Sequence, residues 1–251
     1  MDAVVEKISA AFGSAWSSHL QFDADPQAGP KSAADAYCVQ DKVFSARYPG
    51  RRASAWKAGP AGSQLELAAA PIGEVLAGPA VIAARGFHMF GMEAEVAFRV
   101  GRDLPASAEN WSAAELADAV EEVLVAIELC DTRLANWKTA SPLWRLADFQ
   151  MHGALIAGTG TRNWRDRDFG AQHAELWVNG TRKADRTGSH PLGDPLRVLP
   201  WAAGHCARRG SPLKAGDLVT TGSWTGMEFV SPGATVLARF PGIGEASARI
   251  G

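Results

Sequence analysis

Short segments with the composition of β-strands, each bounded by glycine or proline, recur along this 251-residue chain and limit the folds that it can adopt. Such segments lie at residues 53–58, 81–84, 93–100, 175–178, 218–221 and 233–240, and the last of these is expected to be the final strand. The pair Asn179-Gly180 is typical of a type I′ hairpin turn. Helical segments fall between the strands without strict alternation, which favours an α+β fold over a doubly wound parallel sheet.

Helical signals are clearest near the N-terminus and at residues 195–207. Apolar residues recur at helical spacing over residues 4–12, and a polar loop follows. An acidic variant of the capping box at residues 32–35 predicts a second helix, which the Pro-Gly pair at residues 49–50 ends. We therefore expect one domain that begins with a helical arm.

A further helix is predicted to begin at Ser112, where Ser112 and Glu115 form a capping box. Apolar residues continue at helical spacing, so the helix is expected to extend to about residue 124. The run at residues 124–129 is rich in valine, isoleucine and leucine, and periodicity alone does not distinguish a buried strand from a helix there.

Composition and charge point to a small-molecule ligand. The 27 acidic residues nearly balance the 25 basic ones, so no global field attracts nucleic acid or a membrane surface. The N-terminus lacks the pattern of a signal peptide, and no apolar run approaches the ~18 residues of a membrane span. A cytoplasmic location is predicted.

Cys38, Cys130 and Cys206 fit neither a disulfide framework nor a metal motif, and each is expected to be a small core residue.

Three glutamates are candidate ligands of a cation. Glu93 and Glu95 alternate with apolar residues, so on a strand both side chains project from one face. An isolated pair of this kind is most often a solvated strand face. Glu128 lies in an apolar run, where an unpaired charge is costly. Arg133 is its candidate partner on a structural interpretation, and a hard cation shared with the other two glutamates is the functional alternative.

Polar groups elsewhere suit proton transfer and substrate binding. Lys57 lies among small and aromatic residues, a setting that can depress the pKa of an amine, although an edge-strand lysine is the plainer interpretation. Ser223 and Thr225 follow a strand and could hold a substrate carboxylate. None of the six histidines has metal-ligand spacing, and each is expected to be structural or exposed.

Taken in order, these segments resemble the fumarylacetoacetate hydrolase superfamily, on the branch of 2-keto-4-pentenoate hydratases and 4-oxalocrotonate decarboxylases. The resemblance covers roughly residues 30 to 245 and rests on the ordered segments at residues 36–40, 52–59, 92–98, 101–105, 126–128, 131–133, 147–148, 153–158, 179–180, 213–217 and 221–223. Each segment is common by itself, and the ordered series is specific.

The resemblance implies a β-roll fold flanked by helices, with residues 1–50 as a helical arm packed on a catalytic domain at residues 51–251. It implies Glu93, Glu95 and Glu128 as ligands of Mg²⁺ or Mn²⁺, and Lys57 as an acid/base or substrate-orienting group. The substrate would be a 2-oxo acid. Hydration of a 2-hydroxy-2,4-dienoate in aromatic catabolism is the leading expectation, and decarboxylation of the 4-oxalocrotonate type is the second.

Two departures from the pattern of the branch concern the substrate pocket. Ile72 stands where an acidic residue is typical, and Phe149 stands where an asparagine is typical in the segment at residues 147–151. Glu74, His88 or Gln150 are candidates to replace the lost groups, and Gln150 is expected to bind substrate. The loss at Ile72 also leaves open a weakly active chain that serves as the structural partner of an active homologue. A homo-oligomer is expected because members of the family are usually oligomeric.

Overall fold

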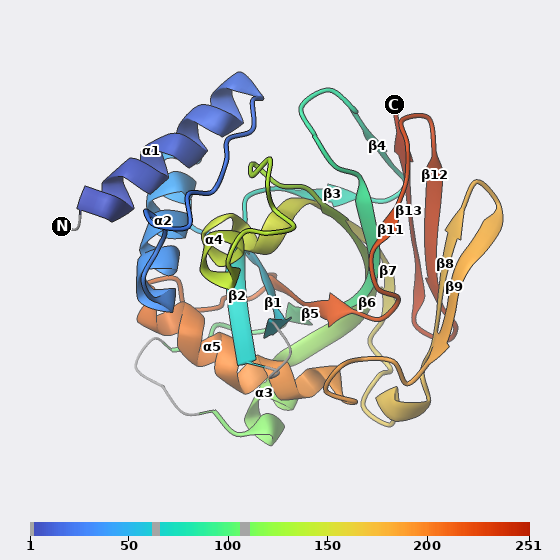
Figure 1. The fold of residues 1–251 in the computed structure, drawn as a ribbon. Coiled ribbons are helices and arrows are strands. Elements are labelled where there is room, and N and C mark those ends of the chain that lie inside the picture. The colour runs from blue at the N-terminus through green and yellow to red at the C-terminus, as the bar shows by residue number, and fades with distance from the viewer. Residues whose placement is uncertain (1–2, 62–65, 106–110) are drawn as a thin grey trace.

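The computed structural model describes residues 3–61, 66–105 and 111–251, which form two β-sheets and a set of helices (Figure 1). The larger sheet has the spatial order β2 (Glu66–Ile72), β1 (Ala55–Ala61), β10 (Leu218–Ser223), β5 (Gly91–Val100), β6 (Val120–Cys130), β7 (His152–Thr161) and β3 (Val75–Ala77), and β11 (Glu228–Phe229) pairs with β5. The smaller sheet has the order β4 (Ala80–Ile82), β13 (Gly244–Ile250), β12 (Thr235–Phe240), β8 (His173–Val178) and β9 (Thr181–Thr187).

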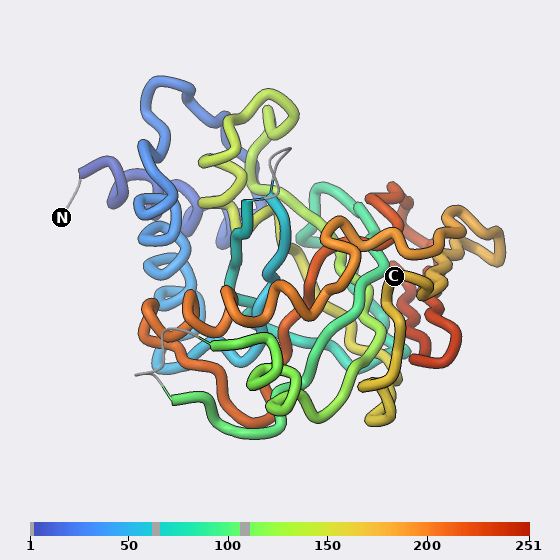
Figure 2. The backbone as a smooth tube through the Cα atoms, turned by 90° about the horizontal axis from the view of Figure 1, so that it is seen from below, coloured from blue at the N-terminus to red at the C-terminus, as the bar shows by residue number. Residues whose placement is uncertain are grey.

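α1 (Ala3–Ser18), α2 (Ala33–Arg47) and α4 (Pro142–Ala147) lie on the opposite side of the curled larger sheet from the smaller sheet, and α3 (Ala113–Ala119) and α5 (Leu199–Arg208) lie below the curled sheet in this view (Figure 1). The 3-10 turns are η1 (Phe149–Met151), η2 (Phe169–Ala171) and η3 (Pro195–Val198). Figure 2 shows the same separation of the N-terminal helices from the C-terminal strands. The expected α+β class is confirmed.

The predicted helix at residues 112–124 is wrong beyond Ala119. The capping box of Ser112 and Glu115 is present, but α3 ends at Ala119 and β6 begins at Val120. β6 lies between β5 and β7, and residues 123–130 are all buried. A strand that is covered on both faces carries a continuous apolar run, which periodicity does not separate from a helix. The alternative interpretation of residues 124–129 as a buried strand is therefore correct.

Other predictions that depend on residues close together in the chain can be compared with the structure. The capping box of Ser32 and Asp35 opens α2, as predicted. Asn179 and Gly180 have φ values of 50° and 74°, the two positive angles that a type I′ turn requires. Residues 195–207 are helical but divide into η3 and α5. The strand that ends at Phe240 is not the last, because β13 follows it and pairs with it.

β7 was not predicted from the sequence, because its glycines weaken the pattern that indicates a strand. A Cβ atom on Gly158 would lie 2.2 Å from the carbonyl oxygen of Glu245 and 2.6 Å from Cα of Ala246. Glycine is thus needed where β7 of the larger sheet crosses close to β13 of the smaller sheet.

The two sheets and the N-terminal helices share one principal hydrophobic core, which includes Phe12 of α1 and Ile250 of β13. Phe12 is fully buried and contacts the rings of Phe22 and Trp144 edge-on.

Cys130 and Cys206 are buried, whereas Cys38 is exposed on α2, so the expectation of a core position is wrong for Cys38. In the parts of the chain described, no helix is long and apolar enough to cross a membrane.

Candidate metal centre

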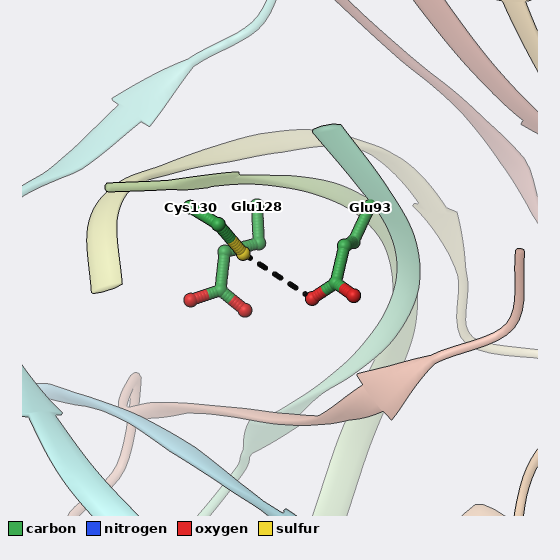
Figure 3. Close-up of side chains that lie close together, drawn as sticks. All are labelled: Glu93, Glu128 and Cys130. Carbon is green, nitrogen blue, oxygen red and sulfur yellow. Dashed lines mark hydrogen bonds between the residues drawn. The ribbon is translucent and has the colours of Figure 1, made fainter. Parts of the chain in front are cut away.

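Glu93 and Glu128 face each other across β5 and β6. The two residues are register partners in the antiparallel ladder, and Cys130 follows Glu128 by two positions on the same strand. Because side chains alternate along a strand, Glu128 and Cys130 project from the same face as Glu93 (Figure 3). One ligand atom from each of these three residues lies within 4.8 Å of the others. The Cys130 thiol donates to Glu93 Oε2 at 3.3 Å.

Glu95 joins this group from the next inward position of β5. It is fully buried, and its Oε2 accepts a hydrogen bond from the Gly222 backbone N–H at 3.1 Å. Burial, and then the nearby charges of Glu128 and Glu93, raise the pKa of Glu95 well above its ordinary value. The structure therefore brings the three predicted glutamates together.

Glu128 is held by two nitrogen groups on one of its oxygens. Lys57 Nζ and His152 Nδ1 each lie 2.9 Å from Glu128 Oε1. Burial raises the pKa of Glu128 to about 7, because the attraction of Lys57 offsets the loss of solvent only in part. Arg133, the partner considered from sequence, instead forms ion pairs with Asp148 and Asp131.

Lys57 is charged, contrary to the suggestion that its setting depresses the amine pKa. Burial does act to lower the pKa, but the attraction of Glu128 and the other acidic groups outweighs it and raises the pKa above its ordinary value. The apolar neighbours in sequence therefore do not determine its charge, because its spatial neighbours are carboxylates. Its Nζ also donates to the backbone carbonyl of Gln150 at 3.0 Å.

His152 is a member of the site that the sequence did not indicate. It is buried, and burial followed by the charges of Lys57 and Arg133 lowers its pKa well below the ordinary value. A neutral ring donates from Nδ1 to the Glu128 carboxylate and so fixes its orientation. Cys130 was also missed, although its spacing of two from Glu128 would have placed it on the same face once residues 124–129 were taken as a strand.

Gln150 lies in a turn of left-handed residues that carries its carbonyl to Lys57. Phe149, Gln150 and Met151 have φ values of 54°, 52° and 61°, an uncommon conformation for non-glycine residues. Among the described residues, the buried Gln150 Oε1 has no hydrogen-bond partner. The backbone of Gln150 thus positions Lys57, and its side-chain oxygen remains available.

The two hydroxyl candidates differ in their bonding. Ser223 lies opposite Glu95 in the sheet register, and its buried Oγ has no hydrogen-bond partner in the described part of the chain. Thr225 Oγ1 instead accepts from the Ala94 backbone N–H and donates to the Gly226 carbonyl. Its hydroxyl is therefore occupied by the backbone.

Ile72 is buried in a small apolar cluster, and Glu74 and His88 are exposed. Within residues 3–61, 66–105 and 111–251, no hydrogen bond or ion pair joins the side chain of Glu74 or His88 to Glu128 or Lys57. Replacement of the lost acidic group by either residue remains a hypothesis.

A cavity of about 370 Å³ adjoins the carboxylates without containing them. His152 lines this cavity and also contacts Glu128, so it links the two. The lining further includes the cationic side chains of Arg47 and Arg85, the aromatic rings of Trp16 and Tyr48, and the carboxylate of Glu74. Asp131 and Arg133 also line it, and these two form an ion pair with each other.

The carboxylate group fits a divalent cation. Glu95 Oε1 and Glu128 Oε2 are buried, no N–H or hydroxyl group of the described residues donates to them, and the Glu95 and Glu128 carboxyl groups lie within hydrogen-bonding reach of each other. The two carboxyl groups interact with each other, and neighbouring carboxylates repel unless a cation or a proton lies between them. A second cluster, of His173, Glu175 and Asp185, already contains the Arg182 guanidinium as its cation.

Residues 61–251, which include the curled sheet and the buried acidic site, match the model of the fumarylacetoacetate (FAA) hydrolase C-terminal domain. The chain belongs to the fumarylacetoacetate hydrolase family, as the resemblance indicated. A solved structure of 4-oxalocrotonate decarboxylase from Pseudomonas putida G7, complexed with magnesium and adipate, aligns with 98% of this chain and 97% of its own at a TM-score of 0.82 and 21% identity. A second, complexed with calcium and acetate, aligns with 98% of this chain and 96% of its own at a TM-score of 0.81 and 20% identity.

Curated relatives point to the same branch. A 2-keto-4-pentenoate hydratase of Paraburkholderia phymatum is 33% identical over 157 residues, which are 62% of this chain and 59% of the relative. A 4-oxalocrotonate decarboxylase of Pseudomonas putida is 29% identical over 158 residues, 63% of this chain and 59% of the relative. The alignment thus spans about three fifths of the length of each relative.

Proposed function

We propose that this protein is a divalent-metal-dependent lyase that hydrates a 2-hydroxy-2,4-dienoate, with Glu93, Glu95 and Glu128 as metal ligands. The observation that carries the proposal is the convergence of three carboxylates and Lys57 in one buried group. The hydratase names of the more identical relatives and the magnesium and calcium of the solved decarboxylase structures support it. Mg²⁺ and Mn²⁺ are the cations proposed from the carboxylate ligands.

A cation held by these glutamates would act as a Lewis acid on the carboxylate and 2-oxo oxygens of the substrate. Lys57 keeps its proton between Glu128 and the Gln150 carbonyl, so it acts as a hydrogen-bond donor and a source of positive charge. His152 and Lys57 hold Oε1 of Glu128, so Oε2 would be available to a cation. Ser223 and Gln150 offer unpaired oxygens for the polar groups of the substrate. Thr225 fastens the segment after β10 to β5, because its Oγ1 accepts from the Ala94 N–H.

The decarboxylase activity is the second candidate. It is favoured by the 4-oxalocrotonate decarboxylase of Pseudomonas putida that is 29% identical over 158 residues, and two solved structures of 4-oxalocrotonate decarboxylase share the fold over 98% of this chain. A structural partner role for a weakly active chain is the third candidate, and Ile72 in place of an acidic group favours it.

An assay of the purified protein with Mg²⁺ or Mn²⁺ and a panel of 2-hydroxy-2,4-dienoates and 2-oxo acids separates these candidates. Loss of the dienol absorbance with incorporation of labelled water supports the hydratase. Release of CO₂ favours the decarboxylase, and inertness over the whole panel favours the partner role. Sedimentation of the same sample tests the homo-oligomer.

Variants connect the activity to the site. Lys57→Met is expected to lower kcat by about 10²- to 10⁴-fold, the range for loss of a positioned proton-transfer or donor group. Lys183→Met on β9 is the control, because that lysine is exposed and lies on the smaller sheet. Unchanged turnover in Lys57→Met would remove Lys57 from the mechanism.

A further inference from the structure

Four large uncharged side chains form an apolar flank beside the glutamates, and we call them the methionine cluster: Met89, Met151, Met227 and Trp137. All four belong to one apolar group with Cys130, two of them buried and two partly buried. Cys130 Sγ lies 3.3 Å from Glu93 Oε2. The cluster is therefore one side chain away from the carboxylates.

The methionine cluster lies on the side from which solvent reaches the site. Glu95 and Glu128 are buried, whereas Glu93 is partly exposed, so a ligand from solvent approaches the glutamates past Glu93. Met227 and Trp137 are partly exposed as well. The apolar flank therefore borders the approach to the site.

A groove continues this flank to the surface. Its volume is about 310 Å³, and Met89 and Trp137 form part of its wall together with polar side chains. Phe229, which is 56% exposed and pairs with Gly91 of β5, lines it too. Lys138 also lines the groove, and its Nζ lies 5.7 Å from the centroid of the Trp137 ring. Because Lys138 is exposed, its charge remains in water.

Backbone contacts fix the cluster to the strands that carry the site. Asp131 Oδ1 accepts from the Met89 backbone N–H at 2.9 Å, and the Asp131 N–H donates to the Met151 carbonyl at 2.8 Å. Met227 lies on Gly91 of β5, where a Cβ atom would be 2.5 Å from its Sδ. Asp131 directly follows β6, so β5 and β6 position both the glutamates and the cluster.

An apolar flank of this kind discriminates between the tails of ligands. Methionine is unbranched and polarizable, so it fits tails of different shape. Each methylene group that a tail buries strengthens binding by about three- to fourfold. A carboxylate in the same place would lose its water, and the nearby cation, Lys57, is already paired with Glu128.

We propose that the methionine cluster binds the tail of the substrate, the end remote from the 2-oxo acid group, and selects an uncharged alkyl or aryl tail over a second carboxylate. The inference rests on the proposed function, because the glutamate site would hold the other end of the substrate. It assigns Met89, Met227 and Trp137 to substrate selection. It also favours the hydratase candidate, since a substrate of the 4-oxalocrotonate type carries a second carboxylate.

Calorimetric titration of the purified protein in the presence of Mg²⁺ tests the proposal without turnover. The probes are 2-oxobutanoate, 2-oxopentanoate and 2-oxohexanoate, together with 2-oxoadipate, which carries a carboxylate in place of the terminal methyl group of 2-oxohexanoate. The dissociation constant is expected to fall by about three- to fourfold with each added methylene group. The affinity for 2-oxohexanoate is expected to exceed that for 2-oxoadipate by about tenfold or more.

Variants at Met227 connect the selectivity to the cluster. Met227→Ala is expected to weaken binding of 2-oxohexanoate by about fivefold and binding of 2-oxobutanoate by less than about twofold, because only the longer tail reaches the removed side chain. Met227→Lys places a cation in the flank and is expected to strengthen binding of 2-oxoadipate by about fivefold or more. Leu237→Ala, on β12 of the smaller sheet, is the control and is expected to change neither. Circular dichroism of each variant excludes unfolding.

The outcomes separate failure of this inference from failure of the proposed function. Suppose that 2-oxobutanoate binds in a manner that requires Mg²⁺ and is abolished in Glu128→Gln, but that 2-oxoadipate binds as tightly as 2-oxohexanoate. That result would overturn the role of the cluster alone, as would an unchanged ratio of these two dissociation constants in Met227→Ala. No Mg²⁺-dependent binding of any probe by the wild type would overturn both.

Discussion

The two oxygens of the buried Glu128 carboxylate have different surroundings. Oε1 accepts from Lys57 and His152, and Oε2 receives no N–H or hydroxyl donor from the described residues, although the Glu95 carboxyl group lies within hydrogen-bonding reach of Glu128. A fully buried ion pair is costly unless further groups complete its hydrogen bonds. Oε2 of Glu128 is therefore the oxygen that the proposed cation would bind.

Gln150 offers a residue-scale test of substrate binding. In Gln150→Ala the backbone carbonyl that binds Lys57 remains, and the unpaired side-chain oxygen is lost. We expect KM to rise by about 5- to 30-fold with kcat nearly unchanged, because one hydrogen bond to substrate contributes ~1–2 kcal/mol. Steady-state kinetics measures both constants. An unchanged KM would show that the side chain does not touch the substrate.

His205 provides a pH-dependent prediction away from the site. Its ring stacks on Trp201 at 4.6 Å, and its Nε2 lies 3.3 Å from Arg209 Nη1. Burial, followed by the charges of Arg209 and Arg208, lowers the pKa of His205 to about 3. The unfolded chain binds a proton near pH 6.5 and the folded chain does not, so this contribution to stability is present above pH 6.5 and is lost as the pH falls toward 3.

Denaturant unfolding at a series of pH values tests this sign. Between pH 7 and pH 5, the free energy of unfolding of the wild type is expected to fall by about 2 kcal/mol more than that of His205→Gln. This figure follows because pH 5 lies about 1.5 units below the pKa of histidine in the unfolded chain. His88→Gln removes an exposed histidine and serves as the control. Parallel pH profiles for the wild type and His205→Gln would contradict the prediction.

β6 and β7 are the elements that position the site, because they carry Glu128, Cys130 and His152. β7 also crosses β13 closely at Gly158, so that the smaller sheet supports the curl of the larger one. The backbone contact at this glycine leaves no room for a side chain. The geometry of the candidate metal site thus depends on contact between the two sheets.

Gly158→Ala tests that dependence at the scale of elements. The added methyl group would meet the backbone of Glu245 and Ala246, and we expect a loss of about 1–3 kcal/mol in the free energy of unfolding. Gly13→Ala is the control, because nothing lies within 4 Å of its Cβ in α1 and a helix gains ~1 kcal/mol from this change. Chemical denaturation measures both. Equal shifts in the two variants would show that the β7–β13 contact is not tight.

At the scale of the whole molecule, the N-terminal helices contact the residues that support the site. Trp16 of α1 lies over the Arg133 guanidinium at 4.3 Å, and Arg133 donates to the backbone carbonyl of His152. Arg133 also forms an ion pair with Asp148. The arm is therefore joined to His152, and through it to Glu128, by direct contacts.

Phe12→Ala tests whether the arm at residues 1–50 and the domain at residues 51–251 unfold together. Phe12 is fully buried, and its truncation is expected to cost about 3–5 kcal/mol. Because the arm and the sheets share one core, we expect a single transition at lower temperature in calorimetry and circular dichroism. Two separate transitions would show that the arm is an independent unit.

The sequence by itself determined the features that depend on residues a few positions apart. The capping boxes, the Asn179-Gly180 turn and the common face of Glu93 and Glu95 follow from local geometry, and they appear in the structure. The ordered motifs identified the family, which the match over residues 61–251 bears out.

The tertiary structure alone decided the register that pairs Glu93 with Glu128, the charge of Lys57, and the entry of His152 and Cys130 into the site. These features arise from contacts between residues far apart in sequence, such as His152 with Glu128 at a separation of 24 residues and Lys57 with Gln150 at 93. Burial and charge at such contacts depend on how the sheets curl and pack, and no local pattern encodes that arrangement.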